Sequence, residues 1–320
     1  MSQEMTAIEW KPVARGIATM VPGIYRIAAR KRGGGTGSAD YCYAVWLKHL
    51  TLLWQSGLRT MPASVAELGP GDSLGVGLAA LLSGASRFYA LDVAAYSNIE
   101  KNLRVLDELV EHFRNRAPQP IKGWPDFDPY LDARRFPSHI LTDDVLARTL
   151  SPNRISAIRE ALRRPGRDGE IVVRNVAPWT DEDAVGKSSV DLVYSHSVLE
   201  HVVDVPAAFR CCASWLREDG WMSHQVDFTS HGVTRAWNGH WQYPEWLWKI
   251  IVGGRPFLIN RHSASAQIRM LEAAGFKIVK QMRNCRDDGM PRSELSAPWK
   301  NMLSDEVSCS DLFVQARKRI

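Results

Sequence analysis

Apolar residues recur along the chain in short blocks, and their spacing alternates between that of a buried strand and that of an amphipathic helix. Consecutive apolar residues indicate strands, whereas apolar residues three or four positions apart indicate helices. The pattern predicts seven strands, at residues 64–68, 87–92, 170–174, 190–195, 221–228, 276–282 and 311–317. Helices are predicted between them, at residues 72–85, 97–114, 205–216 and 265–274.

This alternation is typical of an α/β sheet with helices on both faces. The last two strands have no helix between them that is long enough for a crossover, so we expect them to pair antiparallel. The predicted fold class is therefore a doubly wound, mostly parallel seven-stranded sheet of the Rossmann-like type, with an antiparallel hairpin at its C-terminal end.

Two stretches depart from the alternation. Residues 1–60 combine a basic cluster, a glycine-rich joint and an apolar helix at 40–54, and we expect a helical cap on the substrate side of the main domain, residues 61–320. Residues 115–165 are rich in proline and aspartate, and we expect an insertion there. The basic cluster comprises Arg26, Arg30, Lys31 and Arg32, and the joint spans residues 33–37.

Composition narrows the class of protein. With 45% hydrophobic residues and with aromatic residues spread along its 320 positions, the chain has enough apolar material for a folded core. No apolar run approaches the ~20 residues of a membrane-spanning helix, and the first ten residues lack the apolar segment of a secretory signal. Five cysteines without a CxxC pair favour a reducing, cytoplasmic location. The net charge of +5 is too small and too dispersed to indicate a nucleic-acid partner.

The most informative motif is Glu-Leu-Gly-Pro-Gly-Asp-Ser-Leu-Gly at residues 67–75, where the first predicted strand gives way to a helix. Gly69 and Gly71 allow the backbone to turn sharply and to approach a ligand closely. Asp92 ends the second strand, about twenty residues further on, where a carboxylate can accept both hydroxyls of a ribose. The motif therefore predicts a site for a cofactor that contains a nucleoside.

Local charge favours one kind of cofactor. Glu67 stands before the turn and Asp72 follows it, and two carboxylates would repel a pyrophosphate but suit the amino group of a methionine-like tail. The GxGxxG spacing of dinucleotide sites is also altered, because the third glycine is displaced. A sulfonium nucleoside is thus expected in preference to a dinucleotide.

Three segments together resemble the class I S-adenosylmethionine-dependent methyltransferases, in particular their small-molecule branch. They are ELGPGDSLG at 67–75, YALD at 89–92 and DLVYSHSVLEHV at 191–202. The strand pair after AAGF at 273–276 is also similar to the last two strands of that fold. The resemblance covers about residues 64–317, apart from the insertion.

The resemblance implies S-adenosylmethionine as the cofactor. It places Glu67 near the methionine amino group and Asp92 at the ribose. Such proteins often hold adenine with an aspartate after the third strand, and here that contact would come from Asn175 or from the main chain at Val176. The implied cofactor-binding residues are Glu67, Gly69, Gly71, Asp92, Asn175, Val176 and Ser195.

Methyl transfer to a hydroxyl needs a base that works near the operating pH. His196, after the fourth strand, is the first candidate and His231, after the fifth, is the second; either could instead be a hydrogen-bonded structural histidine. His201 is expected one turn into the following helix, where it would orient its neighbours. No metal is expected, because quinone-pathway O-methyltransferases that resemble this branch carry a glutamate where Ser197 stands before Glu200 and His201.

Aromatic residues are concentrated after the fifth strand, at residues 237–248 (WNGHWQYPEWLW). Together with Tyr41 and Tyr43 they could overhang an acceptor pocket and stack on a sugar or on an aromatic ring. The alternative is that they form a packed local core.

The leading functional hypothesis is methyl transfer from S-adenosylmethionine to a small-molecule or glycan-precursor acceptor, at oxygen. The alternatives are an NAD(P)-dependent oxidoreductase that uses the same turn and Asp92, and a non-catalytic cofactor-binding protein. Methylation of nucleic acid is disfavoured, because Ser-His-Ser-Val at 195–198 stands where a flipped base would be held by an Asn/Asp-Pro-Pro-aromatic element.

Overall fold

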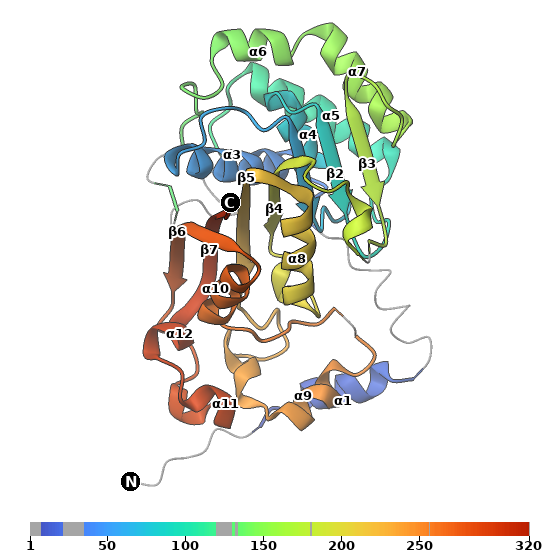
Figure 1. The fold of residues 1–320 in the computed structure, drawn as a ribbon. Helices are drawn as coiled ribbons and strands as arrows, with labels where there is room; N and C mark the ends of the chain where they lie inside the picture. The colour runs from blue at the N-terminus through green and yellow to red at the C-terminus, as the bar shows by residue number, and fades with distance from the viewer. Residues whose placement is uncertain are drawn as a thin grey trace.

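The computed structural model describes residues 8–21, 35–119, 130–131, 134–179, 181–255 and 257–319. Its strands are β1 Ser64–Leu68, β2 Arg87–Leu91, β3 Val172–Val176, β4 Val190–His196, β5 Leu216–Asp227, β6 Phe276–Cys285 and β7 Cys309–Lys318. They form one seven-stranded sheet in the order β3-β2-β1-β4-β5-β7-β6 (Figure 1). The strands from β3 to β5 in that order pair in parallel, and β7 is antiparallel to both β5 and β6. The predicted fold class is confirmed.

The order of the strands creates a switch point beside β1. From β1 the chain adds β2 and then β3 on one side, and it returns to add β4 on the other side. Ligands of doubly wound sheets bind outside the carboxyl ends of the strands at such a point. Here the point lies between Leu68 and Ser195, which are register partners at the ends of β1 and β4.

Helices cover both faces of the sheet (Figure 1). They are α1 Trp10–Thr19, α3 Ala39–Gln55, α4 Gly75–Ser83, α5 Ile99–Arg114, α6 Asp143–Thr149, α7 Pro152–Arg163, α8 Val205–Trp215, α9 Glu245–Val252, α10 Ala264–Ala273, α11 Ala297–Lys300 and α12 Ser304–Ser308. The helices α3, α4, α5 and α7 share one core with Phe88 and Tyr194 of the sheet. On the other face, α8 and α10 pack on a second core that includes Phe209 and Met222. None of the helices in the described ranges is long and apolar enough to cross a bilayer.

Helix α4 begins three residues later than predicted, at Gly75. The residues before it are bound by the N-terminal segment: the Asp72 carboxylate accepts a hydrogen bond from Thr36 N at 2.9 Å, and Ser73 N donates to Thr36 Oγ1 at 3.0 Å. Because Thr36 already satisfies these polar groups, the chain gains nothing from an additional helical turn.

Two strand boundaries also differ from the prediction. β5 begins at Leu216 rather than at residue 221, because Leu216 pairs with Val190 ahead of a register shift in the β4–β5 ladder. The polar residues that follow it, with Asp219 at a φ of +62°, have the composition of a turn and concealed the strand. β3 is displaced by two residues because its pairing with β2 starts at Val172, opposite Arg87.

The stretch predicted as an insertion contributes α6 and α7 to the main core. Ser151 caps α7 by accepting a hydrogen bond from Arg154 N at 3.4 Å, with Pro152 in the first helical position. Ile155 and Ile158 then lie in the same buried cluster as α4 and α5. The described part of residues 115–165 is therefore integral to the main fold.

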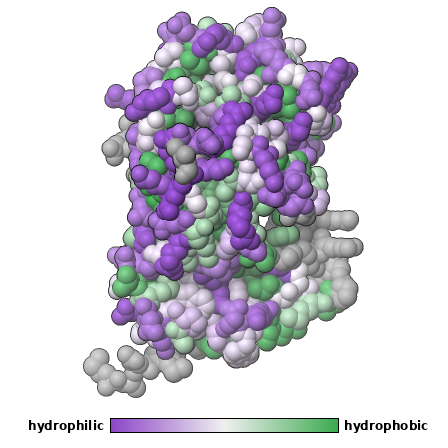
Figure 2. Space-filling view, viewed as in Figure 1, coloured by the Kyte–Doolittle hydropathy of each residue, from purple (hydrophilic) through white to green (hydrophobic). Residues whose placement is uncertain are grey.

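The N-terminal helix α1 packs against α9 rather than against the sheet (Figure 1). Hydrophobic residues gather over these two helices at the bottom of the face in Figure 2. The exposed ones include Trp10, Ile17, Met20, Val21 and Trp246. The predicted basic cluster, Arg26 to Arg32, and the glycines at 33 and 34 lie outside the described residues.

Replacing Gly77 by alanine should destabilise the fold. Gly77 lies in α4 against the ring of Phe88, and a Cβ there would fall 2.0 Å from Phe88 Cζ. Overpacking of a dense core costs about 1–3 kcal/mol, which denaturant unfolding would measure as a lower free energy of unfolding. Gly169→Ala is the matched control, because its Cβ would lie 3.7 Å from the nearest atom. Equal stability of the two variants would contradict the described packing.

Candidate active site

Two glycines shape the turn after β1. Gly69 and Gly71 have φ angles of +65° and +74°, a left-handed conformation that favours glycine. A Cβ on Gly69 would also lie 2.6 Å from Val198 Cγ2, in the loop after β4. The turn therefore lies against the carboxyl end of β4, at the switch point of the sheet, with no room for a larger residue at position 69.

Asp92 follows β2 and is tied to the same turn. Its Oδ2 accepts a hydrogen bond from Gly71 N at 3.2 Å, and its Oδ1 accepts one from Val93 N at 2.7 Å. Burial raises the pKa of Asp92, and these N–H groups partly offset the rise because they stabilise the carboxylate. The side chain is thereby oriented beside the glycine turn, where sheets of this kind bind ribose hydroxyls.

Glu67 lies in β1, just before the turn, and its side chain is buried. Its Oε2 accepts a hydrogen bond from the Tyr194 hydroxyl at 3.2 Å. Burial raises the pKa of Glu67 to about 8, an effect that Tyr194 opposes and the Asp92 charge reinforces. At pH 7 the carboxyl group is therefore mostly protonated, and a cation placed against it would favour the ionised form.

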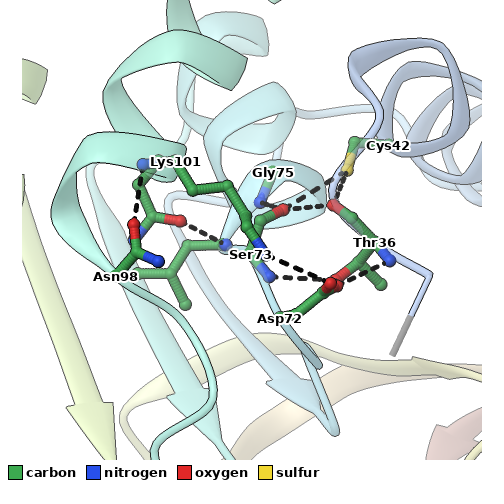
Figure 3. Close-up of polar contacts among 9 residues, drawn as sticks. Thr36, Cys42, Asp72, Ser73, Gly75, Asn98 and Lys101 are labelled. Carbon is green, nitrogen blue, oxygen red and sulfur yellow. Dashed lines mark hydrogen bonds and ion pairs between the residues drawn. The ribbon is translucent and has the colours of Figure 1, made fainter. Parts of the chain in front are cut away.

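Asp72, the second carboxylate expected to repel a pyrophosphate, is bound by Thr36 and Lys101 (Figure 3). Its Oδ1 accepts hydrogen bonds from Thr36 N at 2.9 Å and Thr36 Oγ1 at 2.8 Å, and its Oδ2 lies 3.2 Å from Lys101 Nζ. Partial burial raises the pKa of Asp72, but these partners hold it below its ordinary value. The expectation that Asp72 repels a pyrophosphate is therefore wrong, because its charge is neutralised by Lys101 and used to fix the N-terminal segment.

The residues expected at the adenine lie at the end of β3. Val176 O accepts a hydrogen bond from Asp92 N at 3.1 Å, so this carbonyl group helps to position the carboxylate. Asn175 is exposed, and its Nδ2 donates to Ser97 Oγ at 3.3 Å. Both residues are thus next to Asp92, at the edge of the sheet where the glycine turn lies.

His196, the first candidate base, ends β4 in an enclosed position. Its ring nitrogens are buried, and the rings of His49 and Tyr41 lie at centroid distances of 5.8 Å and 6.0 Å. Burial, followed by the charge of Lys48, keeps the pKa of His196 well below its usual value. The imidazole is therefore neutral across the physiological range, which is less suitable for a general base than a pKa near 7.

Buried polar pairs on both faces of the sheet near His196 were missed by the sequence analysis. Ser223 Oγ lies 2.7 Å from His49 Nδ1 on the face covered by α3, and Ser195 Oγ lies 2.8 Å from His224 Nδ1 on the face covered by α8. Lys48 is fully buried next to His49. Lys48 and His49, two adjacent polar residues in the middle of an otherwise apolar helix, are the sequence signal that could have indicated these contacts. The side chain of Ser195, expected beside the cofactor, instead bonds inside the sheet.

His231, the second candidate base, follows β5 and faces three ionisable side chains. Its Nε2 lies 3.6 Å from Asp227 Oδ2 and 3.8 Å from Glu200 Oε1. The His201 ring lies 4.9 Å from the His231 ring, centroid to centroid. His201 belongs to a short 3-10 turn, η2 Leu199–His201, so its predicted place inside the following helix is wrong. Sequence reasoning did not identify this grouping, because its members come from two separate loops.

The aromatic segment after β5 is mostly a packed core. Its buried members are Trp237, Trp241, Tyr243 and Trp248. Trp246 is the exception and is 63% exposed. Tyr43 is also buried and donates a hydrogen bond to Ala117 O at 2.8 Å, whereas Tyr41 reaches His196. Packing, rather than an aromatic lid over the acceptor, therefore accounts for most of the segment.

A family model described as a methyltransferase domain matches residues 108–281, which is more than half of the chain. The match runs from α5 to β6 and includes the ends of β4 and β5 that carry His196 and the Asp227–His231 segment. No curated protein sequence matches the chain. The chain belongs to this methyltransferase-domain family, and it is a class I S-adenosylmethionine-dependent methyltransferase.

Solved structures similar to the chain have low identities to it. An S-adenosylmethionine-dependent methyltransferase from Mesorhizobium loti is 17% identical, with 85% of this chain and 98% of that chain covered and a TM-score of 0.41. A methyltransferase from Methanosarcina mazei is 10% identical, with coverages of 84% and 97% and a TM-score of 0.43. A phosphoethanolamine N-methyltransferase from Haemonchus contortus is 13% identical, with coverages of 88% and 57% and a TM-score of 0.41. Similarity at this level does not define an acceptor.

Replacing Glu67 by glutamine should change how stability depends on pH. Because the folded-state pKa of Glu67 is raised to about 8, the stability that its protonated form contributes is present at low pH and is lost as pH rises through that value. Between pH 6 and pH 9 the wild type should lose about 2–3 kcal/mol relative to Glu67→Gln, measured by denaturant unfolding at both pH values. A difference that stays constant with pH would contradict a buried, protonated Glu67.

Proposed function

We propose that the protein transfers the methyl group of S-adenosylmethionine to an oxygen of a small-molecule or glycan-precursor acceptor, a sugar or an aromatic compound. The observation that carries the cofactor assignment is the hydrogen bond that ties Asp92 to Gly71 beside the buried Glu67. In this proposal Asp92 binds the ribose hydroxyls, Glu67 faces the methionine amino group, and the two glycines lie under the cofactor. The adenine is bounded by Asn175 and Val176, and the main chain at Ser195 lies beside the methionine portion.

The charges of the turn support a cationic ligand even without Asp72. Glu67 and Asp92 act on each other unfavourably when both are ionised, and burial adds to the cost. A sulfonium ion and an ammonium group would reduce both penalties, whereas a pyrophosphate would increase them. The charges of the turn and the family membership both disfavour the oxidoreductase alternative.

The chemistry of transfer requires an aligned acceptor oxygen and a destination for its proton. The oxygen forms a bond to the methyl carbon while the carbon–sulfur bond breaks, and sulfur leaves as a neutral thioether, so alignment supplies much of the rate. His231 is exposed, with its Nε2 3.6 Å from Asp227 Oδ2, so a proton can pass from it to solvent, whereas His196 is enclosed and burial keeps its pKa well below the usual value. His231 is therefore the better candidate to manage the proton, and the neutral His196 is suited to hydrogen-bonding the acceptor.

The N-terminal segment, the cysteines and the net charge support the rest of the proposal. Helix α3 brings Tyr41 and His49 next to His196, which supports residues 1–60 as a cap on the acceptor side. The five cysteines are all free, which supports a reducing, cytoplasmic location. The dispersed net charge of +5 supports a small molecule rather than nucleic acid as partner.

Asp92→Ala should weaken binding of S-adenosylhomocysteine by roughly 10- to 100-fold, because it removes hydrogen bonds to a charged acceptor. Calorimetric titration of the purified protein measures the affinity. Asp168→Ala is the control, since Asp168 is exposed and, among the described residues, forms a surface ion pair with Arg174 at 3.6 Å. Unchanged affinity in the Asp92 variant would refute the assigned ribose site.

Methyl transfer itself can be followed with an isotope-labelled methyl group on the cofactor. Incubation with the small-molecule fraction of cell extracts should label a product, and the chemical shift of its methyl carbon should be that of a methoxy group. Label on nitrogen or carbon would refute transfer to oxygen. Binding of the cofactor without transfer to any component would support the non-catalytic alternative.

A further inference from the structure

Glu200, His201 and His231 form a compact group of possible metal ligands beside the glycine turn. One ligand atom from each of the three lies within 4.8 Å of the others. Glu200 of this group is two residues beyond Val198, whose side chain lies against Gly69. We propose that these three side chains bind a single divalent metal ion of the zinc type, with a coordination position open toward the acceptor.

The strongest observation is the burial of the Glu200 carboxylate. The residue is only 2% exposed, and within the described ranges the backbone N–H groups of Glu200 and Asp227 lie near the carboxylate, but neither oxygen has a hydrogen-bond partner of good geometry. The charged side chains that act on it most are Asp227 and Asp311, which are also acidic. Buried carboxylates are normally paired with a cation or coordinate a metal. A cation at this position would supply the positive charge that the neighbouring acidic side chains cannot.

His201 is oriented in the manner of a metal ligand. Its Nδ1 lies 3.0 Å from Phe257 O, and because a carbonyl group can only accept, Nδ1 carries the proton in this contact. In the neutral form of this tautomer the lone pair is on Nε2. A backbone carbonyl bound to the distal N–H is the usual support of a histidine that ligates zinc, because it fixes both the tautomer and the ring orientation.

His231 is held in place by an unusual backbone conformation. Its φ of +48° lies in the left-handed region, which is costly for a residue with a side chain and often marks a functional position. The loop is closed by Ser230 N, which donates to Trp237 O at 2.6 Å. In this conformation the His231 Nε2 faces the carboxylates of Glu200 and Asp227.

The distances between these side chains are close to those of ligands that share one metal ion. The His231 nitrogen is 3.8 Å from the Glu200 oxygen and 3.6 Å from the Asp227 oxygen, too far for hydrogen bonds. Two ligands of a tetrahedral zinc ion, each about 2.1 Å from the metal, are separated by about 3.4 Å. Small side-chain movements would therefore close the group around an ion.

The ligand chemistry selects the kind of metal. Two imidazoles and one carboxylate suit zinc or a similar transition metal, whereas magnesium and calcium prefer sites made of oxygen alone. This inference revises the expectation that no metal is bound. That expectation considered only Ser197, Glu200 and His201, and it could not include His231, which comes from the loop after β5.

The role of the ion rests on the proposed function. A metal next to the turn would bind the acceptor oxygen and lower the pKa of its hydroxyl group. The hydroxyl proton would then pass to solvent, the oxygen would take the methyl group, and the thioether would leave. His231 would in that case act as a ligand and not as the base itself.

Metal-free, untagged protein titrated with Co²⁺ tests the site directly, because bound cobalt gives a visible absorption band that reports nitrogen and oxygen ligands. We expect one equivalent to bind and to be displaced by Zn²⁺. The variants His231→Asn and Glu200→Gln should bind cobalt at least tenfold more weakly. His112→Asn is the matched control, because its side chain is 27% exposed, compared with 31% for His231, and it also faces an aspartate.

The two binding measurements distinguish failure of the metal site from failure of the proposed function. No stoichiometric cobalt band in the wild type, equal affinity in the His231 variant, or an equal loss in the His112 variant would each overturn the site. Binding of S-adenosylhomocysteine is measured on the same metal-free samples and is expected to be unchanged. Failure of that binding would count against the proposed function, whatever the result with cobalt.

Discussion

Parallel pairing of β1 with both of its neighbours is the constraint on which the rest of the structure depends. Parallel strands end at the same edge of a sheet, so residues that are far apart in sequence meet there. Glu67, Asp92 and Val176 come from three successive strands of this edge, and His196 comes from the fourth. No single loop could bring these groups together, and each occupies its place because the hydrogen-bonded ladders fix the register.

That edge concentrates negative charge in a poorly hydrated place, and the protein handles each carboxylate differently. Glu67 is kept protonated by burial, with Tyr194 as its partner. Asp92 is held by backbone N–H groups, and Asp72 is neutralised by Lys101. Burial also raises the pKa of Glu200 well above its usual value, but in the described structure neither of its carboxylate oxygens has a hydrogen-bond partner of good geometry, so it is the carboxylate that most calls for an external cation.

The sheet and half of the site could be predicted from sequence because they depend on local pattern. The alternation of strands and helices predicted the fold class, and the spacing from the glycine turn predicted Asp92. The role of Asp72 could not be predicted, because it depends on Thr36, which reaches it from a segment before α3. The grouping of Glu200 with His231 likewise requires two loops to meet, and no periodicity encodes how loops approach each other.

The same non-local contacts explain the errors in the sequence analysis. Lys48 and His49 were concealed in a helix that is otherwise apolar, and only the packing of α3 on the sheet shows that they lie below His196. The tryptophans after β5 had a composition that suits both stacking on a ligand and filling a core. Their burial depends on which surfaces α9 and α11 cover, and that information is spread over the whole chain.

The bond between Asp72 and Thr36 has a consequence for the order of events during turnover. Thr36 stands three residues before α3, and α3 carries Tyr41 to the ring of His196. Under the proposed function, a displacement of the glycine turn by an arriving nucleoside would therefore reach Tyr41 and the surroundings of His196 through one short segment. Such a coupling would make cofactor and acceptor change each other's affinity by the same factor, as thermodynamic reciprocity requires.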